Sequence, residues 1–212
     1  PLNLTIPLLW QGDNAPSYFN WKINKKINDD INNSNVAIID LTATGINRRL
    51  DMKRPTDLTL IVDLLNQSSA NKVPILIRIY AGDVDNDLGV IVKSGADGVI
   101  LVSDKMPMEA ALVSSRNYKD KITIIAETSK LDYQKSAKLL ALGAAGIFLQ
   151  DKCDGNQLKE FGTKLSETIG SLGVGKATDL GTEHLRTTNQ KVASMTGISI
   201  AGYNSVLPMW RH

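Results

Sequence analysis

Residues 73–102 read VPILIRIYAGDVDNDLGVIVKSGADGVILV, and this stretch gives the clearest indication of the fold class. It holds two short runs of mostly branched apolar residues, Val73–Ile79 and Gly98–Val102, on either side of a stretch with helical spacing. Short apolar runs of this kind are typical of buried strands. A glycine followed by one or two small residues, as at Gly95-Ala96-Asp97, is an economical turn from a helix into a strand. The stretch therefore predicts a strand–helix–strand unit.

The same unit recurs along the chain. We expect six principal strands, at Leu4–Leu9, Val36–Leu41, Val73–Ile79, Gly98–Val102, Ile122–Ala126 and Gly146–Leu149. Nearly continuous apolar strands that alternate with helices favour a parallel sheet whose faces are both buried. The predicted fold class is α/β, with parallel βα repeats in a TIM-barrel-like arrangement that is incomplete or modified. An open flavodoxin-like sheet is the alternative.

Apolar stripes at helical spacing predict helices over Leu58–Leu65 and Leu158–Leu172, and a thinner stripe predicts one over Ile23–Ile31. Pro107 suits the first turn of another helix. A complete eight-unit barrel usually takes about 250 residues, whereas the predicted units end near Gly170. We therefore expect a barrel-like domain over residues 1–170. Residues 171–212 form a C-terminal segment packed on the barrel or on a partner, with short helices at Thr182–Arg186 and Gln190–Met195 and an apolar tail at Ile198–His212.

Composition narrows the class of protein. The 212 residues carry a formal net charge of +2, which is too small for a nucleic-acid-binding surface. A single cysteine, Cys153, suits a reducing compartment. The longest apolar runs fall far short of the roughly 20 residues that a membrane helix needs, and the first residues do not resemble a secretory signal. We expect a cytoplasmic protein whose partners are neither nucleic acid nor membrane.

Two charged residues interrupt otherwise apolar strands. Asp40 follows Val36–Ile39, and Arg78 lies between two isoleucines. An unpaired buried charge is costly, so these side chains must be paired or must face a polar cavity. Parallel βα folds bind ligands at the carboxyl ends of their strands. We therefore predict a cluster of Asp40, Arg78 and Glu127 that binds an anionic or polar ligand there. A structural ion pair that closes the rim is the alternative.

The full set of candidate ligand-binding residues is Asp40, Arg78, Lys105, Glu127, Thr128 and Lys130. A wider rim of polar or aromatic residues near the strand ends comprises Trp10, Gln11, Asp13, Thr42, Thr44, Tyr80, Ser103, Asp104, Gln150, Asp151 and Lys152. No catalytic residue is assigned, because Cys153 lies in a turn-like stretch with no histidine nearby and His184 reads as a surface or packing residue. No spacing of ligands predicts a metal site, and no nucleotide-binding motif is present.

Residues 55–202 resemble, in patches, the FMN-binding barrel domain of archaeal-type glutamate synthase. The resemblance rests on the tail segments Ser171–Val174, Asp179-Leu180, Glu183–Arg186 and Thr196–Ile198. Upstream, Pro55–Leu58 through Val73–Arg78 is similar to the helix and strand that deliver a lysine to the family's flavin. Ile124–Thr128 through Ala137–Ala144 resembles its phosphate-binding βα unit. The resemblance implies a flavin-type barrel and, if the chain is an enzyme, an oxidoreductase.

The chain also departs from that family's pattern. Glu127-Thr128-Ser129-Lys130 replaces an Asp-Gly-Gly at the phosphate loop, and a side chain obstructs the close approach of a phosphate to backbone N–H groups. Ser103–Pro107 replaces the glycine-rich substrate loop, and Arg78 replaces the flavin lysine. Cys153 stands alone, whereas iron–sulfur clusters need several thiolates. We expect FMN binding to be weak or absent and no iron–sulfur cluster.

Three functions remain open at this point. The first is a glutamate-synthase-like barrel that binds a small anionic or phosphorylated ligand at the rim. The second is a non-catalytic structural or regulatory subunit that has lost its cofactor. The third is an aldolase- or isomerase-type barrel enzyme in which Lys105 or Lys130 is the reactive amine. The apolar tail predicts a homo-oligomer or a subunit of a larger complex, and tail packing within one monomer is the alternative.

Overall fold

The structure, a computed structural model, describes residues 8–12, 18–21, 31, 34–42, 55–70, 73–104 and 106–202. For residues 8–12, 18–21 and 55–57 it describes the backbone only. Several sequence-based predictions fall outside these residues. They are the start of the first predicted strand, nearly all of the predicted helix at Ile23–Ile31, the rim positions Asp13, Thr44 and Lys105, and the tail from Tyr203 onward.

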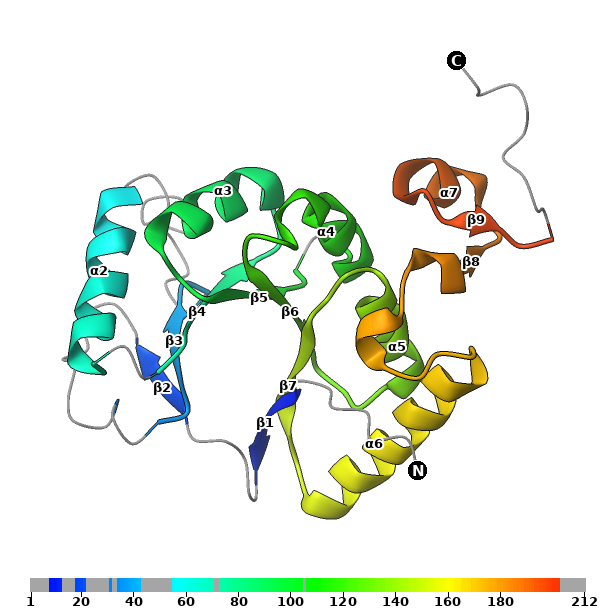
Figure 1. Cartoon of the computed structure of the whole chain (residues 1–212), viewed down its shortest axis with the longest axis horizontal. Coiled ribbons are helices and arrows are strands. Elements are labelled where there is room, and N and C mark those ends of the chain that lie inside the picture. Colours follow the sequence, from blue (N-terminus) through cyan, green and yellow to red (C-terminus); the bar gives the residue numbers. More distant parts are fainter. Residues whose placement is uncertain are drawn as a thin grey trace.

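One curled sheet holds seven strands. They are β1 (Leu8–Gly12), β2 (Tyr18–Trp21), β3 (Val36–Asp40), β4 (Ile75–Tyr80), β5 (Gly98–Val102), β6 (Thr123–Thr128) and β7 (Gly146–Cys153). Their order is β1-β7-β6-β5-β4-β3-β2, and all neighbouring pairs are parallel. Figure 1 shows the strands as an arc, with β1 and β2 at its two ends.

Five helices cover the convex side of this arc (Figure 1). They are α2 (Pro55–Ser68), α3 (Val84–Ser94), α4 (Met108–Ser114), α5 (Tyr133–Ala141) and α6 (Gly155–Ser171), and a short 3-10 turn, η2 (Arg116–Tyr118), follows α4. Strand–helix units of this kind confirm the predicted fold class of parallel βα repeats in an incomplete barrel. None of the helices in the described part of the chain has both the length and the apolar character that crossing a bilayer requires.

Details of the predicted elements differ from the structure. The strand β2 was not predicted, although Tyr18, Phe19 and Trp21 are aromatic residues that strands favour. Pro107 precedes α4 as its N-cap residue and is not in the first turn, because its backbone is extended with φ −56° and ψ 140°. The predicted turn after Gly95 is confirmed, since this glycine ends α3 with a left-handed φ of 80°.

Strands β3 to β6 bury residues on both of their faces, as the apolar runs predicted. Residues that point toward the helices form the main core, for example Ala37, Ile77 and Leu101. Residues that point to the inside of the arc form a second cluster, which we call the inner plug: Val36, Ile38, Leu76, Ile100, Ile125 and Phe148. Gly98 has no room for a side chain beside this plug, because its Cβ would lie 2.6 Å from Leu76 Cδ2.

The C-terminal segment forms a small βαβ unit that extends away from the arc (Figure 1). Two 3-10 turns, η3 (Ala177–Asp179) and η4 (Thr182–His184), lead to β8 (Arg186–Thr187), α7 (Gln190–Thr196) and β9 (Ser199–Ile200), and β8 and β9 are parallel. The predicted helix at Thr182–Arg186 is therefore only one 3-10 turn, because the chain is already extended at Arg186. Val174, Leu180 and Ile198 join the main core and anchor the segment.

Candidate functional site

Asp40 and Arg78, the two charged residues that interrupt apolar strands, meet Glu127 at the mouth of the arc. Arg78 on β4 donates from Nε to Glu127 Oε2 at 2.6 Å and from Nη2 to Glu127 Oε1 at 2.7 Å. This paired contact is the strongest geometry that a guanidinium makes with a carboxylate. Nη1 of the same guanidinium lies 3.1 Å from Asp40 Oδ2 and 3.2 Å from Asp40 Oδ1. The predicted cluster of Asp40, Arg78 and Glu127 is thus present, and we call it the mouth cluster.

Thr42 completes the mouth cluster. Its hydroxyl accepts a hydrogen bond from Arg78 Nη1 at 2.6 Å and donates one to Asp40 Oδ1 at 2.6 Å. Its backbone N–H also donates to Asp40 Oδ1 at 3.0 Å. A short polar side chain two residues after an aspartate commonly closes a local turn of this kind. Thr42 therefore holds the carboxylate of Asp40 in one orientation against the guanidinium.

The mouth cluster lies directly above the inner plug, because side chains two residues apart on a strand point the same way. Each charged residue lies two positions after a plug residue: Asp40 after Ile38 on β3, Arg78 after Leu76 on β4, and Glu127 after Ile125 on β6. On β5, which runs between β4 and β6, the residue beside Arg78 is the apolar Ile100. The arginine side chain is 17% exposed and that of Glu127 only 4%. The site is therefore a charged layer with the apolar plug beneath it, in which the arginine is still partly exposed.

The contacts within the mouth cluster favour the charged form of Arg78. The hydrogen bond to Glu127 raises the pKa of Arg78, and the charges of Glu127 and Asp40 raise it further, against a smaller opposing effect of burial. Two carboxylates facing one guanidinium leave the cluster with one surplus negative charge. The second hydrogen of Nη2 has no partner among the described residues. Any negative charge on a ligand must therefore be met largely by basic groups outside the cluster.

The remaining candidate residues lie elsewhere. Thr128 is buried and follows Glu127, so it points to the helix side of β6, and its hydroxyl donates to the carbonyl of Lys130 at 3.3 Å. Lys130 is exposed just beyond the end of β6. On the wider rim, Ser103 donates to the carbonyl of Met106, and Gln150, Asp151 and Lys152 are exposed residues within β7.

Cys153 is not in a turn-like stretch, as the sequence suggested, but is the last residue of β7. It is 6% exposed, and its Sγ donates to the carbonyl of Asp151 at 3.3 Å. Burial raises the pKa of the thiol, and the nearby carboxylates of Asp151 and Asp154 raise it further. The reactive thiolate is thus disfavoured. Across the described ranges, no three His, Cys, Asp or Glu side chains are grouped in a way that could hold a metal ion.

Aspartates begin the two helices that follow β6 and β7. Asp154 accepts hydrogen bonds from the backbone N–H groups of Asn156 and Gln157, both at 2.8 Å, and Gln157 Oε1 accepts one from Asp154 N at 3.0 Å. Asp132 accepts from the N–H of Lys135 at 2.9 Å. Neither cap was predicted from the sequence, although an aspartate three residues before a glutamine, as in Asp154 and Gln157, is a known helix-start signal.

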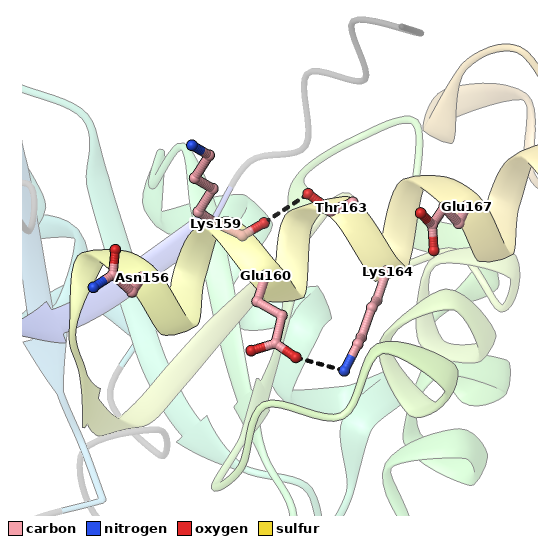
Figure 2. Close-up of a pocket in the computed structure, with 6 residues that line it drawn as sticks. All are labelled: Asn156, Lys159, Glu160, Thr163, Lys164 and Glu167. Carbon is pink, nitrogen blue, oxygen red and sulfur yellow. Dashed lines mark hydrogen bonds and ion pairs between the residues drawn. The ribbon is translucent and has the colours of Figure 1, made fainter.

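A hollow of about 380 Å³ lies on the exposed face of α6 (Figure 2). Its lining comes from one helix: Asn156, Lys159, Glu160, Thr163, Lys164 and Glu167. Lys164 Nζ lies 2.6 Å from Glu160 Oε1, and both side chains are largely exposed. The hollow joins none of the candidate residues and has balanced charges. We therefore place the candidate site at the mouth cluster.

No family model matches this sequence, and no curated protein matches it. Solved structures do match its fold. A double mutant of flavocytochrome b2 with pyruvate bound has a TM-score of 0.61 at 18% identity, covering 95% of this chain and 61% of that one. The recombinant flavin-binding domain of baker's yeast flavocytochrome b2 has a TM-score of 0.60 at 16% identity, with the same two coverages.

A third solved structure, DHODH from Eimeria tenella in complex with ferulenol, has a TM-score of 0.53 at 12% identity, covering 74% of this chain and 58% of that one. The chain thus spans about three fifths of the length of these structures. Identities this low show a shared fold, and the fold is that of their barrels.

Proposed function

We propose that this chain is a barrel protein of the flavin-binding type, a diverged relative of the glutamate synthase barrel, that binds a small anionic ligand at the mouth cluster. The similarity of its fold to a flavin-binding domain supports the type of barrel. The observation that carries the proposal is the placement of Asp40, Arg78 and Glu127 above an apolar plug at the carboxyl ends of the strands. That edge is where barrel proteins of every chemistry bind their ligands.

The energetics of the cluster favour a binding role. Taking charges out of water costs several kcal/mol per ion, and well-packed apolar residues are often at least as stabilising as a buried ion pair. A charged layer above an apolar plug is therefore a poor choice for stability alone. Its arginine is held on both sides by carboxylates, so a ligand would meet a rigid guanidinium edge with no side-chain ordering to complete.

The phosphate of FMN does not fit this mouth. A phosphate needs free backbone N–H donors, which helix N-termini and left-handed loop residues supply. The first N–H groups of α6 are occupied by Asp154, and an N–H of α5 is occupied by Asp132. Between Glu127 and Asp132 no residue has a positive φ. The proposed function therefore does not require bound FMN.

A non-catalytic subunit is the second candidate function. It is favoured by the same contacts, because Asp40, Thr42 and Glu127 occupy nearly all of the donors of Arg78, as a structural cluster that closes the rim would. The two functions differ in whether a ligand reaches the guanidinium.

Two probes test the proposal through the NMR signal of the Arg78 Nε–H group. Pyruvate serves as a small monoanion, and riboflavin serves as a flavin without phosphate. We expect each to shift the signal saturably in the wild-type chain, because both would contact the guanidinium edge. A shift with pyruvate alone would keep the anion site and remove the flavin part. No shift with either probe would contradict the proposal and favour the non-catalytic subunit.

Variants connect the signal to the cluster. Arg78→Lys keeps the charge but loses the planar fork, so we expect pyruvate to bind at least tenfold more weakly, measured by the shifts of backbone amides around the mouth. Thr42→Val leaves the ion pair in place, and we expect a smaller loss of pyruvate affinity. It is also a second test of the cluster in case Arg78→Lys misfolds. Arg186→Lys, at an exposed position on β8, is the matched control with unchanged binding. Equal affinity in all four proteins would contradict the assignment.

A further inference from the structure

The helices that follow β6 and β7 stand where a barrel of this kind commonly binds phosphate. Such sites are formed by the loops after the last strands together with a helix N-terminus, whose free N–H groups face the anion. β6 and β7 are the last strands of the sheet along the chain, and α5 and α6 begin directly after them. The N-termini of these helices therefore decide whether the mouth accepts a phosphate group.

At each N-terminus an aspartate of the chain binds N–H groups of the first turn, two at α6 and one at α5. At α6, Asp154 binds the N–H groups of Asn156 and Gln157, and the side chain of Gln157 binds the N–H of Asp154 in return. At α5, Asp132 binds the N–H of Lys135. Each aspartate also places a negative charge where a phosphate would have to lie. A phosphate monoester carries about −1.5 to −2 charges at neutral pH and would be repelled there.

The mouth cluster adds an independent obstacle to a doubly charged ligand. Its two carboxylates exceed its one guanidinium by one negative charge. Lys130, exposed beyond β6, and Lys152, exposed on β7, are the described lysines of the rim, so a ligand with a single negative charge is easier to accommodate than a doubly charged one. The capped N-termini of α5 and α6 and the surplus negative charge of the mouth cluster thus disfavour a phosphate group for separate reasons.

We propose that the ligand of this mouth carries no phosphate group and is a small monoanion of the carboxylate class. This inference rests on the proposed function, because it names the ligand class of the same site. It implies that the flavin-binding type of fold persists here without the anchoring of a phosphate.

Inorganic phosphate is the direct probe, followed through the backbone amide signals of Lys135, Asn156 and Gln157. We expect no saturable shift in the wild-type chain in the millimolar range. Asp154→Ala frees two N–H groups and removes a charge, so a saturable shift at Asn156 and Gln157 should appear, with affinity at least tenfold above that of the parent. Asp151→Ala removes a nearby exposed charge without freeing an N–H group, and it should behave like the parent. Saturable phosphate binding by the wild-type chain would overturn the proposal.

Asp154→Asn provides a second variant in case the alanine variant folds poorly. Asparagine can still cap the helix but lacks the charge, so we expect phosphate affinity between those of the parent and of Asp154→Ala. Binding by Asp154→Ala no tighter than by the parent would also overturn the proposal, since capping would then not be what excludes phosphate.

Flavins give a further comparison. We expect FMN to bind the wild-type chain no more tightly than riboflavin, and an FMN affinity tenfold higher would contradict the inference. The phosphate titration does not depend on any ligand at Arg78. Failure of the proposed function, seen as an unresponsive Arg78 signal, is therefore distinguishable from failure of this inference.

Discussion

The inner plug and the mouth cluster occupy the same face of the same strands, yet they differ in every chemical respect. On β3, β4 and β6 the change from an apolar to a charged side chain takes two residues, from Ile38 to Asp40, for example. The plug is apolar and almost fully buried, whereas the cluster consists of three charges near the strand ends. Burial favours the first arrangement and opposes the second. Along each of these strands, a level that stabilises the fold by apolar burial is thus followed by a level of charges that burial opposes.

Shortening the largest plug side chain should produce the largest effect. Phe148 is 4% exposed inside the arc, and Phe148→Ala should lower the free energy of unfolding by about 3–5 kcal/mol through lost burial and the cavity left behind. Urea denaturation followed by circular dichroism measures the change. Leu60→Ala, at a 66% exposed position on α2, is the control and should change stability much less. A comparable loss in both variants would remove the distinction between plug and surface.

Breaking one half of the mouth cluster should cost somewhat less. Glu127→Gln keeps the shape and leaves Arg78 paired with Asp40, but it replaces the two charge-assisted hydrogen bonds to the guanidinium, so we expect a loss of about 1.5–3 kcal/mol in the free energy of unfolding. The same urea experiment measures it. An unchanged midpoint would mean that the cluster is better solvated than its burial indicates.

Replacing the whole cluster should nearly restore stability. In the triple variant Asp40→Leu, Arg78→Met, Glu127→Leu, no charge is left unpaired and the apolar plug is extended upward. We expect its free energy of unfolding to lie within about 1 kcal/mol of the parent, because apolar replacements of buried ion pairs are often neutral. A triple variant less stable than Glu127→Gln would show that the charges of the mouth cluster stabilise the fold.

Cys153, the last residue of β7, belongs to the main core and not to the inner plug, and its buried thiol makes stability depend on pH. Because the folded thiol has a raised pKa, the folded chain keeps its proton at a pH at which the unfolded chain loses it. The stability from the buried thiol is fully present below the ordinary pKa of 9.0 and is lost as pH rises through the higher folded value. The melting temperature of the wild-type chain should therefore fall more between pH 8 and pH 10 than that of Cys153→Ala. Parallel falls in the two proteins would contradict this.

The smallest effect is expected for an ion pair outside the arc. Lys164 and Glu160 are as close as Arg78 and Glu127, at 2.6 Å, but both are largely exposed on α6. Exposed pairs contribute little, since water and salt screen them. Glu160→Gln should leave the urea midpoint unchanged within error. A loss as large as that of Glu127→Gln would show that burial does not set the energetic difference between the two pairs.

The parts of the structure that the sequence predicted are those with a strong local signal. Runs such as Val36–Ile39 are apolar at every position, and only a strand buried on both faces explains that pattern. The pairing of Asp40 with Arg78 followed because both charges interrupt such runs, and parallel strands bring their carboxyl ends to one edge. In these cases a residue and its immediate neighbours in the sequence are enough to predict the structure.

Other features depend on contacts that no local pattern reveals. The strand β2 holds only four residues and lies at the edge of the sheet, so its sequence shows no long apolar run. Thr128 was expected in the mouth with Glu127, but alternation along β6 turns it to the opposite face. The unit of β8, α7 and β9 has strands of two residues each, too short for any period to appear.

The position of β1 has a consequence for the order of folding. The sheet from β3 to β7 is built from strands that are neighbours in the chain, whereas Leu8 of β1 pairs with Ile147 of β7, across nearly the whole domain. Closing a longer loop costs more chain entropy, by about 0.6 kcal/mol for each doubling of its length, and contacts distant in sequence slow folding. We expect β3–β7 to assemble first, with β1 as the last strand to dock, so its pairing with β7 should set the overall rate of folding.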